Sequence, residues 1–130
     1  MYSKTTHQIR VTVQPQYLDQ QSRPDENHYV WAYSIEISNE GAGDVQLLNR
    51  HWIITDGRGQ VQEVKGPGVV GEQPVLHPGD SFTYTSGCPL ATPSGIMAGR
   101  YEMETPDGER FWVDVPAFSL DSPYQGIVLN

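Results

Sequence analysis

The stretch Tyr29–Ser38, YVWAYSIEIS, decides the fold class. Its large apolar side chains fall on every second position, at 31, 33, 35 and 37, and smaller or polar groups alternate with them. A period of two sends neighbouring side chains to opposite faces of an extended chain, as in a β-strand with one buried face. An amphipathic helix would need apolar residues every three or four positions. The stretch therefore predicts a strand that lines a core.

Comparable runs recur along the chain between turn-forming residues. Val45–Asp56 is apolar on both faces, which is typical of a strand inside a sheet. Asp56-Gly57 and Pro106-Asp107-Gly108 carry turn signals of β-hairpins. The remaining expected elements are strands at His7–Val13, Gln60–Lys65, Ser81–Ser86, Arg100–Thr105 and Glu109–Val115, and a long connection at Gln14–Asn27.

These runs add up to about seven short strands without a sustained helical stripe, because proline or glycine interrupts each candidate. The pattern predicts an all-β fold, an antiparallel β-sandwich of two sheets of the fibronectin type III or immunoglobulin-like kind. A chain of 130 residues has the size of one domain. We expect its core at about 7–120 and a C-terminal tail over 121–130.

Composition and charge narrow the range of partners. Eight Lys and Arg against sixteen Asp and Glu give a net charge of -8, which repels nucleic acid and anionic membrane surfaces. The charge favours a basic partner or a cation, or serves solubility alone. No stretch approaches the ~20 apolar residues of a membrane span, and the N-terminus lacks the apolar core of a signal peptide. We therefore expect a cytoplasmic protein without membrane insertion, and the single cysteine fits a reducing compartment.

One motif suggests phosphate chemistry: Gly66-Pro67-Gly68-Val69-Val70-Gly71 fits the pattern G-x-G-x-x-G. In dinucleotide-binding units these glycines let the backbone approach a pyrophosphate, and the amides of a following helix meet its charge. Here Pro74 and Pro78 follow instead, and they disfavour that helix. We expect a structural loop that bridges the two sheets, with Gly66, Gly68 and Gly71 as a candidate anion loop and no cofactor otherwise.

Catalytic and metal-binding patterns are missing from the sequence. Cys88 precedes Pro89, which disfavours the helix N-terminus that usually activates a thiol, so we expect a small buried side chain. No serine lies in a nucleophile elbow, and the four histidines lack metal-ligand spacing. A metal site from separate strands, such as His51 with Asp56, remains open. We expect no catalytic residues, no metal ligands and no enzyme activity.

The triplet Arg50-His51-Trp52 places a cation, a titratable ring and an indole on alternating faces of one expected strand. One interpretation buries Trp52, with Arg50 in a surface ion pair or with its stem along the surface and its charge in water. In the other, His51 and its neighbours line an exposed, aromatic-rich recognition surface.

The chain resembles the bacterial ApaG family over about Ile9 to Leu120. The stretches that carry the resemblance are Tyr29–Tyr33, Val45–Leu48 with Arg50–Asp56, Gly66–Pro74, and Tyr84–Leu90 with Thr92-Pro93. The resemblance implies a fibronectin type III-like sandwich, which in eukaryotes is found within F-box proteins and a polymerase delta-interacting protein. It also implies an association with cobalt resistance and magnesium efflux, and gene neighbours that act on RNA methylation and diadenosine tetraphosphate.

Three functional hypotheses follow. The leading one is a non-catalytic protein-interaction module with an unknown protein partner, present as a monomer or as a homodimer formed through an edge strand. The second is binding or hydrolysis of pyrophosphate or a (di)nucleotide at the Gly66–Gly71 loop. The third is a divalent-cation sensor.

Overall fold

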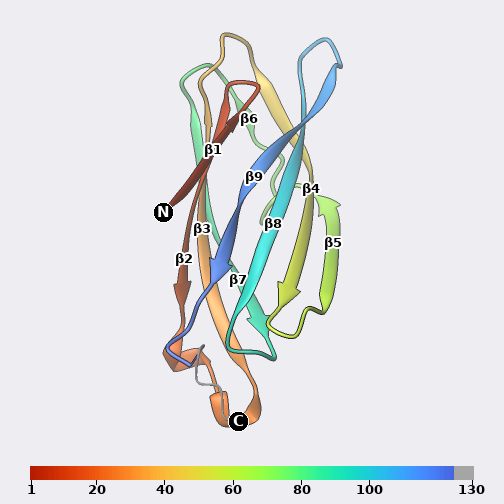
Figure 1. Cartoon of the computed structure of the whole chain (residues 1–130). Coiled ribbons are helices and arrows are strands. Elements are labelled where there is room, and N and C mark those ends of the chain that lie inside the picture. The colour runs from red at the N-terminus through yellow and green to blue at the C-terminus, as the bar shows by residue number, and fades with distance from the viewer. Residues whose placement is uncertain (125–130) are drawn as a thin grey trace.

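The computed structural model of the chain describes residues 1–124, which form two antiparallel sheets packed face to face (Figure 1). The first sheet has the order β1 (Tyr2–Thr6), β2 (Ile9–Tyr17), β3 (Tyr29–Asn39) and β7 (Ser81–Leu90). The second has the order β5 (Val61–Pro67), β4 (Val45–Asp56), β8 (Gly95–Glu104) and β9 (Arg110–Leu120), and β6 (Val75–Leu76) also pairs with β4. Two 3-10 turns, η1 (Asp19–Gln21) and η2 (Pro24–Glu26), connect β2 to β3. The expected all-β sandwich is confirmed.

The core lies between the sheets and follows the alternation of the strands. Trp31, Tyr33, Ile35 and Ile37 of β3 are all buried, as the period of two predicts. The second sheet contributes Trp52, whose ring makes edge-on contacts with the rings of three core aromatics: Tyr33, Tyr101 and Phe118. Each such side chain stabilises the fold by about 1.5–3 kcal/mol when fully buried. Within residues 1–124 the helical segments are the two short 3-10 turns, and neither could span a membrane.

The N-terminal hairpin differs from the sequence-based expectation. His7 and Gln8 have φ angles of 49° and 66° and form the two-residue turn between β1 and β2, so the strand expected to begin at His7 begins at Ile9. Positive φ at both turn positions matches the right-handed twist of a hairpin. Strand β2 also continues through Pro15 to Tyr17, into the stretch expected to be a connection. The expected count of about seven strands omits β1 and the short β6.

The C-terminal part of the chain contributes to the core. Strand β9 continues beyond Pro116, and Phe118 and Leu120 are fully buried. The indole Nε1 of Trp31 then donates a hydrogen bond of 2.7 Å to the carbonyl oxygen of Asp121. The start of the expected tail is thus fastened to β3, while its residues 125–130 lie outside the described part.

The sandwich has a closed and an open side. On the closed side β1 and β2 pack against β9, and Lys4 Nζ lies 2.8 Å from Asp114 Oδ2. On the open side the sheets end in β7 and in β5, and a cavity of about 420 Å³ lies between them. The candidate site lies on the open side.

Candidate binding site on the open side of the sandwich

Both sheets line the cavity, whose volume is that of a small-molecule site. The first sheet contributes polar groups from β3 and β7: Tyr33, Tyr84, Ser86 and Cys88. The second sheet and the glycine loop contribute one cation and a largely apolar wall: Arg50, Trp52, Ile54, Val64, Met97, and Val69 to Gly71. The site is therefore apolar over much of its surface and polar at one group of side chains.

The glycine loop is built around a tight turn. Val69 N donates to Glu72 O and Glu72 N donates to Val69 O, each over 2.9 Å. Between them, Val70 and Gly71 have φ angles of 43° and 80°, which identifies a two-residue turn with positive φ at both positions. The turn itself thus uses one amide of the candidate anion loop, that of Val69, and the amide of Glu72 directly after it.

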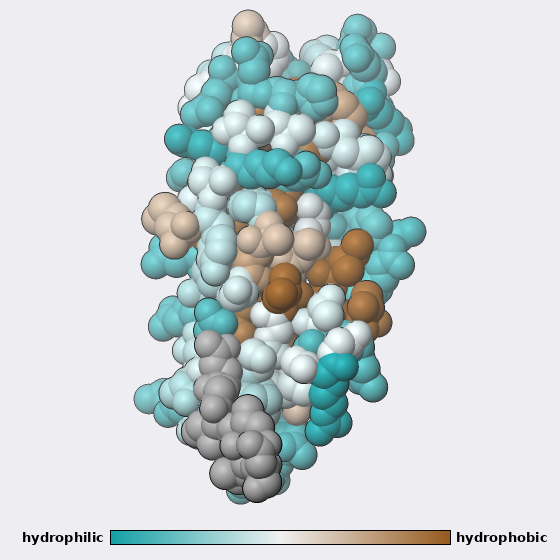
Figure 2. Space-filling view, in the orientation of Figure 1, coloured by the Kyte–Doolittle hydropathy of each residue, from teal (hydrophilic) through white to brown (hydrophobic). Residues whose placement is uncertain are grey.

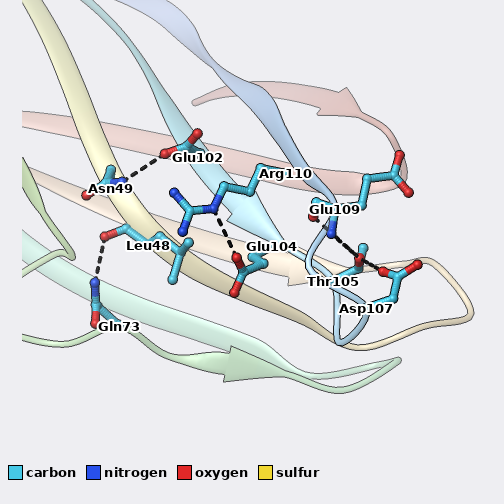
Figure 3. A network of polar contacts seen from close by, with 9 residues as sticks. All are labelled: Leu48, Asn49, Gln73, Glu102, Glu104, Thr105, Asp107, Glu109 and Arg110. Atoms are coloured by element: carbon cyan, nitrogen blue, oxygen red, sulfur yellow. Dashed lines mark hydrogen bonds and ion pairs between the residues drawn. The ribbon is translucent and has the colours of Figure 1, made fainter.

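The loop is also fastened to a bulge in β4. The register of β4 against β8 shifts between Leu47 and Asn49. The carbonyl oxygen of Leu48 there accepts a hydrogen bond from Gly68 N over 2.8 Å. It accepts a second one from Gln73 Nε2 over 2.9 Å (Figure 3). We expected a loop that bridges the two sheets. That expectation is wrong, because the loop joins β5 to β6, which both pair with β4.

Each candidate glycine meets a requirement of this loop. A Cβ on Gly66 would lie 3.0 Å from the guanidinium of Arg50. A Cβ on Gly68 would lie 2.3 Å from the Glu72 carbonyl oxygen, and its φ is +62°. Gly71 occupies the second position of the turn, where φ is +80°. In the described residues 72–80 no helix follows, so no helix amides face the loop.

Arg50 lies on the inner face of β4 together with the buried Trp52. Its Nη1 donates to the carbonyl oxygens of Pro67 and Gly68 over 2.8 and 3.0 Å. Within residues 1–124 it forms no ion pair with a carboxylate. The burial of Trp52 considered from the sequence is confirmed. Of the two arrangements considered for Arg50, the surface ion pair is not formed among the described residues. The guanidinium is instead held at the cavity wall under the glycine loop.

Three tyrosine hydroxyls gather near this cation. The hydroxyl oxygens of Tyr84 and Tyr101 are 2.5 Å apart and buried. Burial raises the pKa of Tyr33, Tyr84 and Tyr101 above the ordinary value, although the charge of Arg50 acts in the opposite direction. All three are therefore neutral at physiological pH and offer hydrogen bonds without negative charge.

Cys88 lines the same cavity and is only 3% exposed. Burial raises the pKa of its thiol to about 11. The group is accordingly protonated at neutral pH, and a protonated thiol is a poor nucleophile. This agrees with the small buried side chain expected from the sequence.

The outward edge of β7 carries unpaired backbone groups. Val30 N donates to Ser22 Oγ and Val30 O accepts from Leu18 N, so Val30 is not hydrogen-bonded to its partner Pro89. Since pairing alternates along an antiparallel ladder, every second residue of β7 directs its amide and carbonyl away from β3. These residues are Ser81, Thr83, Thr85 and Gly87, whose amides form no hydrogen bond within the described part of the chain, and Pro89, which has only a carbonyl.

A second polar site lies on the outer face of the other sheet, beside apolar side chains that are exposed on the same face (Figure 2). Arg100 Nε donates to His51 Nδ1 over 3.2 Å, so the proton of the neutral ring is on Nε2, which lies 2.5 Å from Glu63 Oε1. This contact lowers the pKa of Glu63. The guanidinium of Arg100 lies 4.0 Å above the ring of Trp112. The side chain of His51 is 11% exposed, and the recognition surface considered from the sequence therefore presents Arg100 and Trp112 more than His51.

Histidine and carboxylate side chains do not cluster as metal ligands would. Within the described residues, no three His, Cys, Asp or Glu side chains gather around a common point. His51 contacts Glu63, whereas Asp56 Oδ1 accepts hydrogen bonds from the amides of Arg58 and Gln60. The pairing of His51 with Asp56 considered from the sequence is not formed.

Sequence reasoning missed the polar group of the cavity. Tyr33, Tyr84 and Ser86 come from two strands, and no local spacing reveals that these strands are neighbours. The register places Tyr33 opposite Ser86. A signal was present, since Tyr33 and Tyr84–Ser86 fall within stretches that carry the family resemblance.

Comparisons with known proteins agree with that resemblance. A family model described as "ApaG domain" matches residues 19–105. "Protein ApaG" of Paramagnetospirillum magneticum is 65% identical over 130 residues, and that of Rhodospirillum centenum is 64% identical over 124 residues; the alignments cover 100% and 95% of both chains, respectively. A crystal structure of a protein from Bordetella pertussis has a TM-score of 0.86 at 50% identity, covering 88% of this chain and 94% of that one. The chain belongs to the ApaG family.

Proposed function

We propose that the chain is a non-catalytic protein-interaction module that binds an extended segment of a partner by adding it as a strand to β7. The observation that carries this proposal is the free edge of β7 beside the cavity on the open side. Backbone groups at a sheet edge supply affinity in this mode of recognition, and pockets for alternate side chains supply specificity. The open side offers both.

The residues along this edge suit the approach of another strand. Ser81, Thr83, Thr85 and Gly87 are small and exposed, so their side chains leave the edge accessible. Pro89 has no amide and marks one end of the row. The neutral thiol of Cys88 and the neutral tyrosines supply no activated nucleophile, which supports a binding role and not a catalytic one.

Two other hypotheses stay predictions. Pyrophosphate or nucleotide binding at Gly66, Gly68 and Gly71 would need amides that the loop does not already use, and Val69 and Glu72 bond to each other. A divalent-cation sensor would need a ligand cluster, and within residues 1–124 no three His, Cys, Asp or Glu side chains form one. On our proposal, a link to cobalt resistance and magnesium efflux acts through the protein partner.

A proline on the free edge tests the proposal. Thr83→Pro removes one outward amide and places a ring in the path of an added strand, while the ladder with β3 keeps its hydrogen bonds. Thr83→Ala is the matched control because it keeps the amide. We expect a stoichiometric partner captured from lysate to bind the wild type and Thr83→Ala equally and Thr83→Pro at least about tenfold more weakly, a loss of ~1.4 kcal/mol.

Circular dichroism and thermal unfolding show whether the three proteins are equally folded. A partner that binds folded Thr83→Pro as tightly as the wild type would refute strand addition at β7. Repeated failure to recover any stoichiometric partner would count against an interaction module altogether. A change in the mass of the free protein on Thr83→Pro would instead identify a second copy of this chain as the added strand.

A further inference from the structure

We infer that the segment added to β7 carries an acidic side chain, which enters the cavity and binds Arg50. The inference rests on the proposed function, because the partner segment brings the carboxylate to the site. The inference states the chemical class of that segment. It rests on the charge and the lining residues of the cavity in addition to the free edge of β7.

The geometry of an added strand directs its side chains into the cavity. Side chains of neighbouring strands stand on the same face at paired positions, and strands lie about 4.8 Å apart. The inward side chains of β7 at this level are Tyr84, Ser86 and Cys88, which line the cavity. Inward side chains of a strand paired with this part of β7 would therefore point into the same space.

The net charge of -8 favours a basic partner over the surface as a whole, but the local charge of the cavity, from Arg50, selects an anion. The hydrogen bonds of Arg50 within the described residues use Nη1 alone, so Nη2 and Nε keep donors for a ligand. Tyr33 and Ser86 add hydroxyls on the opposite wall. A guanidinium with free donors matches the two oxygens of a carboxylate, and within residues 1–124 no acidic side chain takes that place.

A carboxylate fits this cavity better than a phosphate does. Its single negative charge balances the one guanidinium. A dianion would keep one uncompensated negative charge, which the net charge of -8 of the chain repels. The remaining wall is apolar and includes Trp52, Ile54, Val64 and Met97, which suits the methylene stem of an acidic side chain. Glutamate has the longer stem and is the residue that we expect.

Selection of peptides tests the inference without knowledge of the natural partner. A library of random peptides of about twelve residues, displayed at the N-terminus of a carrier so that they have no free C-terminal carboxylate, is selected on the wild-type protein. Binders that compete with one another and lose affinity for Thr83→Pro define the β7 edge. We expect these sequences to share a Glu or Asp at one position within an alternating, strand-forming pattern.

A double-mutant comparison then assigns the contact. In a selected peptide, Glu→Gln should weaken binding to the wild-type protein by about tenfold or more, as expected for the loss of a charge-assisted hydrogen bond. The same change in the peptide should weaken binding to the Arg50→Gln protein by less than about twofold. Arg50→Lys should keep part of the discrimination. Tyr33→Phe leaves the contacts of Arg50 with the loop intact and should reduce discrimination by a few-fold.

The outcomes separate the inference from the proposed function. Binders that depend on the β7 edge but lack a shared acidic residue, or that respond equally to Glu→Gln on the wild type and on Arg50→Gln, would overturn the inference and leave strand addition standing. Failure to select any binder sensitive to Thr83→Pro would contradict both. Competition of the selected peptides by pyrophosphate at lower concentrations than by acetate would show that the cavity prefers a phosphate and would also overturn the inference.

Discussion

On the closed side of the sandwich, polar groups of the two edge strands contact each other. On the open side, some polar groups of the edge strands have no partner among the described residues. On the closed side, the hydroxyl oxygen of Tyr2 accepts a hydrogen bond from Ser119 N, and Lys4 pairs with Asp114, so side chains of β1 and groups of β9 satisfy one another across the sheets. On the open side, the corresponding edges are those of β7 and β5. The outward amides of β7 have no partner in the described part of the chain, and Arg50 lines the cavity between the two edges.

The difference between the two sides indicates where a stable fold can leave groups free for recognition. Both sides enclose the same core, but polar groups on the closed side contact partners within the fold. On the open side the glycine loop fills part of the gap and is held by Leu48 and Arg50, yet it leaves the edge of β7 accessible. The groups that keep the loop in place therefore also shape the candidate site.

The largest expected effect comes from the glycine loop. Gly68→Ala should destabilise the protein by about 3 kcal/mol, because its Cβ would overlap the carbonyl oxygen of Glu72 at a positive φ. Gly71→Ala is the matched control: its φ is also positive but its Cβ would meet open space, so the cost should be about 1 kcal/mol. Urea denaturation measures both values. Equal losses would show that the loop relaxes around residue 68.

A smaller effect distinguishes the cations of the two sides. Arg50→Met should lower the free energy of unfolding by about 1.5 kcal/mol, because the carbonyls of Pro67 and Gly68 lose a charged donor. Lys4→Met on the closed side removes an ion pair between half-exposed groups and should cost about 0.5 kcal/mol or less. The measurement is again chemical denaturation. A larger loss at Lys4 would reverse our view of which side relies on its cation.

The hydroxyls of Tyr84 and Tyr101 form a buried pair. Replacing either tyrosine by phenylalanine should lower the free energy of unfolding by about 1 kcal/mol, because the other hydroxyl is left without its partner. The double variant should lose less than the sum of the single ones, because no orphaned hydroxyl remains. A double-mutant cycle by thermal or urea unfolding gives the coupling. Strict additivity would mean that the two hydroxyls find other partners.

The smallest effect concerns pH. The hydrogen bond that His77 Nδ1 donates to Asp44 Oδ1 raises the pKa of the imidazole. Because the pKa in the folded state is above the unfolded value of about 6.5, the contact contributes fully below that pH and its contribution disappears as pH rises through the folded-state pKa. His77→Ala should therefore lower the melting temperature slightly at pH 5.5 and not at pH 9. A loss that is larger at pH 9 would contradict this assignment.

The sequence predicted those parts of the fold in which side chains alternate without interruption. Tyr29–Ser38 and Val45–Asp56 correspond to β3 and β4 almost residue for residue. The hairpin at His7 and Gln8 could not be foreseen, because neither residue is a usual positive-φ turn former and β1 is mostly polar.

Only part of the candidate site could be predicted. The glycine loop was identified from its motif, and its structural role follows from the missing helix. The cavity was not foreseen, since it depends on the pairing of β3 with β7 and on a bulge at Leu48 that turns Arg50 inward next to Trp52. Both features arise from long-range register, which local patterns do not encode.

Amide hydrogen exchange along β7 tests the central claim most directly. In the free protein the amides of Thr83, Thr85 and Gly87 should exchange quickly, and those of Tyr84 and Ser86, which bond to β3, slowly. Binding of a selected peptide should protect the first set and leave β1 unchanged. Fast exchange at Thr83, Thr85 and Gly87 in the complex, with new protection on the closed side, would contradict the account.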